Sequence, residues 1–195
     1  RGGSFSGFLA KVPEANLLHK KMLQVSRKLQ EALTDGESWT AAHEPARRSL
    51  YRGQCSCAYW HGVSGGLLLP FLRDRLYREL IAAEKILDER SQGASDWIAF
   101  DQRDLDSDLA EEVLVETPQL SMVVDPQAGG VASEIDYRPA GLNLTNTLSR
   151  WPVARPPGAP AAEPGPGVDR WLRRCFLDRF PAVGTTVEDL LRGDY

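Results

Sequence analysis

The feature that most constrains the fold is a change in the spacing of apolar residues at about residue 96. Before this point apolar side chains recur every three or four residues, which is the spacing of one face of an α-helix. After it they alternate with polar residues, which is typical of strands. We therefore predict an α+β fold, with an N-terminal small helical bundle followed by a partial antiparallel β-sandwich.

Three helices are expected in the first half of the chain. The first follows Pro13, has apolar residues at positions 18, 22, 25 and 29, and stops near Asp35-Gly36. The second begins near Glu44-Pro45. The third is the clearest and extends from Leu67 to Leu87, with Pro70 in its first turn, a position that proline favours.

Four strands are expected in the second half, at residues 97–100, 112–116, 120–124 and 131–137. Pro118, Asp125-Pro126 and Gly129-Gly130 supply the turns between them. Short strands at this spacing favour an antiparallel sandwich over a parallel sheet. Two amphipathic segments follow near the end of the chain, at residues 171–177 and 185–191.

These patterns divide the chain into two predicted domains, residues 1–92 and residues 93–195. The second is expected to be truncated and to contain a proline- and glycine-rich insertion at residues 156–167. The chain starts at Arg1 without an initiator methionine or a signal-peptide pattern. We therefore expect it to be an internal piece of a longer protein.

Composition excludes several classes of partner. The net charge of −4 and a pI near 5.5 lack the basic field that nucleic acids or membrane surfaces attract. No apolar run approaches the roughly 18 residues of a membrane span. Three cysteines, an odd number without a secretory signal, favour reduced thiols and a cytoplasmic location.

The most unusual stretch runs from Leu50 to Gly62. It brings Gln54, Tyr59, Trp60 and His61 together beside glycines, which let a backbone approach a ligand closely. Aromatic faces stack on the C–H faces of sugar rings, while glutamine and histidine bond to hydroxyls. The same pattern also suits core aromatics at a helix end. The residues alone leave both interpretations open.

This stretch carries a resemblance to a known family. Residues 52–73 read RGQCSCAYWHGVSGGLLLPFLR and resemble a block of the family 57 glycoside hydrolases, which are α-amylases and 4-α-glucanotransferases. Further matches are PEAN at 13–16, HKKML at 19–23, EIDYRP at 134–139 and NLTNTL at 143–148. Because the matches follow one another in order, the chain is identified as the helical middle region and the start of the β domain of such a protein.

The resemblance implies an enzyme that acts on α-1,4-glucans by retaining hydrolysis or transfer. Its catalytic barrel precedes this region and supplies a Glu nucleophile and an Asp acid/base. No catalytic residue is therefore expected here, and the isolated 195 residues should be inactive. The expected partners are the α-glucan substrate and the missing N-terminal catalytic barrel.

Trp60 is implied to stack on the bound glucan. The full set of candidate substrate-binding residues is Trp60, Cys57, Tyr59, His61 and Gln54. Cys57 stands where several archaeal members have an aspartate that bonds to sugar hydroxyls. Because a thiol is a poor hydrogen-bond partner, this difference predicts an altered sugar contact.

Asp104, Asp106 and Asp108 alternate like the first ligands of a calcium loop. The glycine expected next is Leu109 and the final carboxylate is Val115, so the segment is not an EF-hand. A calcium site and a solvated acidic loop both remain open, and no other cofactor is expected. Cys55-x-Cys57 is too closely spaced for a structural zinc site and favours inert thiols.

Two classes of function fit these observations. The chain is either part of a glucan hydrolase or transferase, or a non-catalytic carbohydrate-binding or scaffolding module. The protein sequence preceding residue 1 distinguishes them, because only the first class requires a barrel with the two carboxylates.

Overall fold

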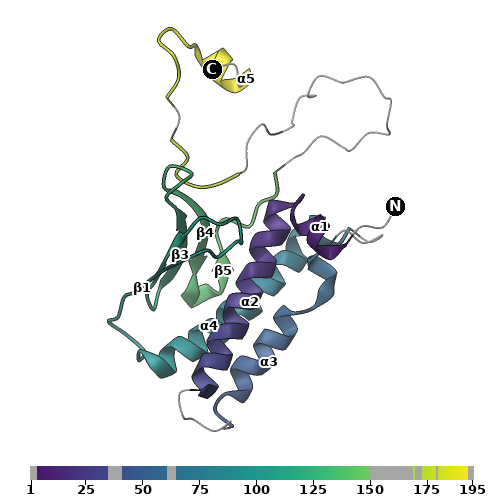
Figure 1. The fold of residues 1–195 in the computed structure, drawn as a ribbon, viewed down its shortest axis with the longest axis vertical. Helices are drawn as coiled ribbons and strands as arrows, with labels where there is room; N and C mark the ends of the chain where they lie inside the picture. The colour runs from purple at the N-terminus through teal and green to yellow at the C-terminus, as the bar shows by residue number, and fades with distance from the viewer. Residues whose placement is uncertain are drawn as a thin grey trace.

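The computed structural model describes residues 4–34, 41–60, 65–149, 169, 173–178 and 180–192. It has a bundle of helices packed against one antiparallel sheet (Figure 1), so the predicted α+β class is confirmed. The helices are α1 (Phe5–Leu9), α2 (Pro13–Thr34), α3 (Glu44–Gly53), α4 (Pro70–Ser91) and α5 (Val187–Arg192). Short 3-10 turns lie at η1 (Ser56–Ala58), η2 (Gly66–Leu68) and η3 (Arg138–Ala140).

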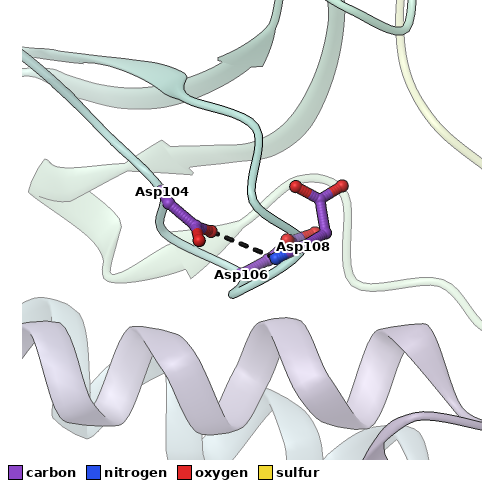
Figure 2. Close-up of side chains that lie close together, drawn as sticks. All are labelled: Asp104, Asp106 and Asp108. Atoms are coloured by element: carbon purple, nitrogen blue, oxygen red, sulfur yellow. Dashed lines mark hydrogen bonds between the residues drawn. The ribbon is translucent and has the colours of Figure 1, made fainter.

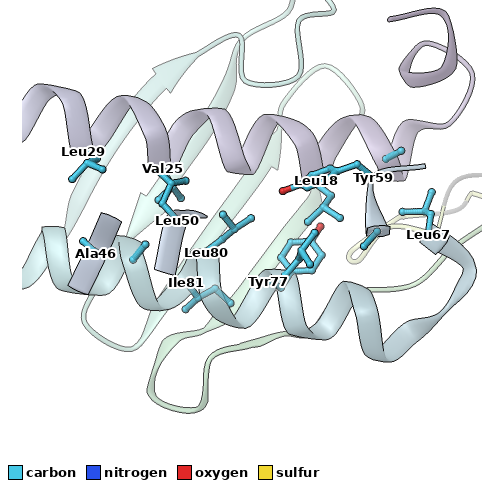
Figure 3. Close-up of a cluster of buried hydrophobic side chains, with 14 of the residues drawn as sticks. Leu18, Val25, Leu29, Ala46, Leu50, Tyr59, Leu67, Tyr77, Leu80 and Ile81 are labelled. Carbon is cyan, nitrogen blue, oxygen red and sulfur yellow. The ribbon is translucent and has the colours of Figure 1, made fainter. Parts of the chain in front are cut away.

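Helices α2, α3 and α4 form the bundle, and their apolar faces meet in one core (Figure 3). Leu18, Leu80 and Ile81 are almost completely buried there. Burying a side chain of this size stabilises the fold by roughly 1.5–3 kcal/mol. At Gly53 a Cβ would lie 2.5 Å from Cδ2 of Leu80, so glycine permits the close approach of α3 to α4.

The third predicted helix begins later than expected. Residues Gly66–Leu68 form the separate turn η2, Leu69 is extended, and α4 starts at Pro70. The positive φ of Gly66, 45°, is incompatible with the first turn of an α-helix. The prediction that the helix begins at Leu67 was therefore wrong by three residues, because apolar spacing does not report backbone conformation.

The sheet consists of β1 (Ala99–Arg103), β2 (Glu112–Glu116), β3 (Leu120–Asp125), β4 (Val131–Tyr137) and β5 (Leu142–Asn143), in that order across the sheet. Every neighbouring pair is antiparallel. The predicted strands at 112–116 and 131–137 are confirmed residue for residue, whereas β1 lies two residues later than the prediction and β5 was not foreseen.

The inner face of the sheet lies against α2 and α4 and carries charged as well as apolar side chains. Glu116, Glu134 and Asp136 are buried on this face. The outer face is mostly apolar, with Gln102 of β1 as a polar member beside Val113, and the register aligns Val115, Met122 and Ile135 across three strands. Among the described residues there is one sheet, and the second layer of the predicted sandwich is not among them.

The last part of the chain is described only in pieces. Cys175 forms an isolated bridge with Ala132 on β4, so the described part of the predicted amphipathic segment, residues 173–177, lies beside the sheet. The segment predicted at 185–191 overlaps α5, which begins at Val187 and ends at Arg192. The proline- and glycine-rich stretch at 156–167 lies outside the described residues.

Candidate functional site

Trp60 lies in the connection between α3 and α4, directly after the turn η1. Its side chain is 55% exposed, which is unusual for the largest apolar side chain and leaves much of the indole open to solvent. The backbone of Trp60 is held firmly, because its carbonyl accepts a hydrogen bond of 2.9 Å from the N–H of Leu67. The indole is therefore presented on a fixed support.

Gly66 makes this support possible. A Cβ at this position would lie 2.1 Å from the carbonyl oxygen of Trp60 and 3.1 Å from that of Cys57. Gly66 also has a φ of +45°, which side chains rarely adopt. The paired glycines of the sequence motif thus serve a packing purpose, since they let the chain fold back against the Trp60 peptide.

Tyr59 has the opposite environment from its neighbour. It is only 5% exposed, and its hydroxyl donates a 2.5 Å hydrogen bond to the carbonyl of Gly53. Its ring contacts the edge of His19 at 6.1 Å between centroids, and burial raises the pKa of its hydroxyl. Tyr59 is thus a core residue that anchors the loop, whereas Trp60 is a surface residue.

Of the remaining candidate substrate-binding residues, two are exposed and one lies outside the described part of the chain. Gln54 is exposed and its Nε2 lies 3.6 Å from Sδ of Met22, and Cys57 is exposed beside Cys55. A hydrogen bond in which the Cys57 thiol donates to Cys55 raises the pKa of Cys57, with help from the charge of Cys55. His61 lies outside the described residues. The structure therefore gathers Gln54, Cys57 and Trp60 on one exposed connection, and their predicted contact with sugar remains a prediction.

The three aspartates of the acidic loop also lie together (Figure 2). One carboxylate oxygen from each of Asp104, Asp106 and Asp108 falls within 4.8 Å of the others. Asp104 accepts hydrogen bonds from the backbone N–H groups of Ser107 (2.6 Å), Asp108 (3.2 Å) and Leu109 (3.1 Å). These bonds fold the loop by the side-chain-to-backbone pattern of an Asx turn, and the calcium site remains a prediction.

The acidic loop is also attached to the helical bundle. Asn16 on α2 donates a 2.8 Å hydrogen bond to the carbonyl of Asp106, and Lys20 donates one of 2.6 Å to Oγ of Ser107. Burial, with help from the charge of Asp108, raises the pKa of Asp106. The loop thus connects the sheet to α2, whether or not it holds a cation.

A buried ionic cluster was missed by the sequence reasoning. Lys21 on α2 is almost fully buried and directs hydrogen bonds of 3.0 and 3.2 Å at the carboxylate of Glu84 on α4. Its Nζ also lies 2.9 Å from Oε1 of Glu134 and 2.9 Å from Oδ2 of Asp136, both on β4. One cation therefore faces three buried carboxylates.

A second part of the cluster surrounds Lys28. Its Nζ lies 3.0 Å from Oδ1 of Asp88 and 2.5 Å from Oε1 of Glu116. Arg138 donates a 2.6 Å hydrogen bond to Asp88, which joins α4 to the segment after β4. Charged residues at alternate positions of the strands were the available signal, because alternation in β2 and β4 places them on the inner face.

The chain has an α+β fold, an exposed tryptophan packed beside a glycine, and a sheet attached to the helices by buried ion pairs. Comparisons with known proteins identify the class of protein that has these features. A family model described as "Alpha-amylase/4-alpha-glucanotransferase, middle domain" matches residues 3–87. A second, "Alpha-amylase/4-alpha-glucanotransferase, C-terminal", matches residues 104–154. The chain belongs to this α-amylase/4-α-glucanotransferase family of family 57 glycoside hydrolases, as the sequence motifs indicated.

Individual relatives agree with the family models. The chain is 39% identical over 150 residues, or 77% of its length, to "Alpha-amylase 1" of Dictyoglomus thermophilum. It is 32% identical over 97% of its length to the "4-alpha-glucanotransferase" of Thermococcus kodakarensis. A crystal structure of the 4-alpha-glucanotransferase from Thermococcus litoralis matches all of the chain with a TM-score of 0.74 at 27% identity.

The chain is much shorter than these relatives. It spans 20% of the Dictyoglomus protein, 29% of the Thermococcus kodakarensis protein and 30% of the matched crystal chain. Within the described part of the chain, no helix has both the length and the apolar character needed to cross a membrane.

Proposed function

We propose that this chain is the helical middle region and the beginning of the C-terminal β-sandwich domain of an enzyme that acts on α-1,4-glucans. The enzyme either hydrolyses the glucan or transfers part of it to another sugar. The observation that carries this proposal is the exposed, rigidly supported Trp60 within a chain of this family. The three free thiols fit a reducing, cytoplasmic location.

The proposed mechanism assigns this region to substrate positioning. The reacting carboxylates, a Glu nucleophile and an Asp acid/base, would come from an N-terminal barrel that precedes the chain in the whole protein. The small share of the relatives' length that the chain covers supports such a missing part. Trp60 would stack on a glucosyl ring at the rim of the site, with Gln54 and Cys57 beside it.

Restraint of the backbone that carries the indole favours stacking on a sugar ring. The hydrogen bond between Trp60 and Leu67 and the close packing of Gly66 restrict the loop before any ligand arrives. Less conformational freedom is therefore lost on binding, which leaves more of the stacking energy available as affinity.

Replacing Trp60 tests this proposal. In the full-length protein, Trp60→Ala should lower kcat/KM for maltooligosaccharides by a factor that corresponds to roughly 1–3 kcal/mol of transition-state binding. Tyr51→Ala provides the control, since Tyr51 is an equally exposed aromatic residue on α3 outside the loop. An unchanged kcat/KM for Trp60→Ala would refute the stacking role.

The isolated chain gives a separate test of where the chemistry resides. Because it contains neither predicted catalytic carboxylate, the 195-residue chain should not release or redistribute glucose units from maltooligosaccharides. Chromatography of the sugars after prolonged incubation measures this. Detectable disproportionation would contradict the assignment of catalysis to a preceding barrel, and a full-length protein without such a barrel would favour the non-catalytic binding module.

A further inference from the structure

A cleft of about 380 Å³ opens between the last turns of α2 and α4 and the edge of the sheet at β1 and β2. This volume lies within the range of small-ligand sites, roughly 300–1,000 Å³. The cleft lies beyond Leu87, near the end of α4, whereas Trp60 precedes the start of that helix. A helix of 22 residues is about 33 Å long, so the cleft and the Trp60 loop are far apart.

The unsatisfied side-chain amide of Gln24 on α2 is the first indication that the cleft binds a ligand. Its side chain lines the cleft and is only 7% exposed, yet its Nε2 has no hydrogen-bond acceptor among the described residues. Leaving a buried donor unsatisfied destabilises the fold, because its hydrogen bonds to water are lost and not replaced. A ligand oxygen in the cleft would satisfy this amide.

The charged residues around the cleft indicate a neutral ligand. Lys28 is already held by Asp88 and Glu116 at 3.0 and 2.5 Å. Arg27 pairs with Glu31 at 3.6 Å, and Arg103 pairs with Asp101. Because each of these cations already has a carboxylate, the cleft offers no surplus positive charge for a phosphate or a carboxylate ligand. Its carboxylates can instead accept hydrogen bonds from hydroxyl groups.

Trp97 provides an aromatic wall. Its ring lines the cleft, its Nε1 donates a 3.0 Å hydrogen bond to the carbonyl of Gly93, and the guanidinium of Arg138 lies 5.4 Å from the ring centroid. These contacts fix the orientation of the ring. An oriented indole next to an amide and several carboxylates matches the surface of a sugar, which has apolar C–H faces and hydroxyl edges.

We propose that this cleft is a second binding site for a neutral oligosaccharide, an α-1,4-glucan segment, separate from the Trp60 contact. The choice of glucan rests on the proposed function. The site would retain a long polysaccharide while another part of the same molecule is processed, with Gln24 donating to a sugar oxygen and Trp97 stacking on a ring.

Calorimetric titration of the full-length protein with maltotriose tests the proposal, with chromatography afterwards to establish that the sugar is intact. The unmodified protein should show two binding events. Trp60→Ala should weaken one of them without affecting the other, and Gln24→Met should weaken the other about tenfold, as expected for the loss of one hydrogen bond. Gln102→Met is the matched control, since Gln102 lies on β1 outside the cleft, bonded to Glu111.

Gln24→Met should also raise or preserve the thermal midpoint, because it removes an unsatisfied buried amide without creating a cavity. A lower midpoint would show that the amide has a protein partner and overturn the premise. Unchanged maltotriose binding in Gln24→Met, with activity on amylose retained, would refute the second site alone. Absence of any activity on amylose would instead refute the proposed function.

Inorganic phosphate distinguishes the ligand class. Titration with phosphate should give no heat at this cleft. Phosphate binding that Gln24→Met abolishes would overturn the assignment to a neutral sugar.

Discussion

Trp60 and Gly66 are coupled although Gly66 lies six positions after Trp60 in the chain. The peptide of Trp60 occupies the space that a Cβ at residue 66 would need, so the position of the indole depends on the absence of a side chain there. The placement of the Trp60 side chain therefore depends on a glycine six positions later in the chain.

This coupling predicts the effect of Gly66→Ala. The new Cβ meets backbone rather than a movable side chain, and the positive φ adds strain, so the free energy of unfolding should fall by on the order of 2 kcal/mol or more. Urea denaturation measures the change. Gly129→Ala distinguishes the steric clash from the backbone strain. Gly129 also has a positive φ, but no atom lies within 4 Å of its Cβ position. Equal losses in both variants would contradict the steric coupling.

Adjacent residues also show what the sequence can predict about the site. Tyr59 and Trp60 are chemically similar, and the pattern alone left both as core or sugar-contacting residues. Only the fold separates them, since the Tyr59 hydroxyl donates to the carbonyl of Gly53 inside the bundle, whereas Trp60 is 55% exposed. The motif singled out the connection between α3 and α4, whereas the exposure of each side chain there depends on contacts between distant segments.

Individual strands were predictable because alternation is a local property. The apolar alternation of β2 and β4 predicted their bounds, and it also fixed which residues share a face. It did not show that the buried face would be the one with glutamates and aspartates. That outcome depends on Lys21 and Lys28, which lie more than 80 residues away from β2 and β4 in the chain and supply the opposite charges.

The ionic cluster makes stability depend on pH. Burial, opposed by Lys21 and assisted by Asp136, raises the pKa of Glu134 from 4.5 to about 8. A group whose pKa is higher in the folded state stabilises the fold fully below its unfolded pKa, and that contribution is lost as the pH rises through the folded value. Glu134 therefore favours folding at pH 4.5 and loses this effect by about pH 8.

Glu84 behaves in the opposite way. Although burial alone would raise its pKa, Lys21 and Lys28 lower it to about 2. Its contribution to stability is present above pH 4.5 and is lost as the pH falls towards 2. The two carboxylates together should place the maximum of stability in mildly acidic solution.

We therefore expect the free energy of unfolding to fall by on the order of 1–3 kcal/mol between pH 5 and pH 8. Glu134→Gln keeps the shape of the side chain without a titrating proton, and should flatten this slope and be more stable than the parent at pH 8. Denaturant unfolding at the two pH values provides the measurement. The control is Glu111→Gln at an exposed position. A slope that Glu134→Gln leaves unchanged would show that Glu134 does not titrate in this range.

At the scale of the whole molecule, buried ion pairs connect the two predicted domains. The boundary between residues 92 and 93 separates helices from strands along the chain, yet Lys21 and Glu84 on one side contact Glu134 and Asp136 on the other. Removing one member of such a group leaves buried charge uncompensated. The helices and the sheet should therefore unfold together.

The outer face of the sheet gives the last prediction. Its apolar side chains, several of them exposed, are those of Phe100, Val113, Val115, Leu120, Met122, Val124, Ile135, Tyr137 and Leu142. In a β-sandwich such a face packs against a second sheet. If the predicted sandwich is correct, this surface is covered in the full-length protein.

Met122→Lys should then destabilise the full-length protein by roughly 2–4 kcal/mol, because a charge would be placed between two packed sheets. In the isolated 195-residue chain the same substitution should change the unfolding midpoint little and reduce self-association, since the lysine would reach water. Gln30→Lys at an exposed position of α2 is the control and should be tolerated in both. Thermal unfolding and light scattering of the two forms measure these effects. Equal tolerance of Met122→Lys in both forms would leave the outer face without a covering layer and would contradict the predicted sandwich.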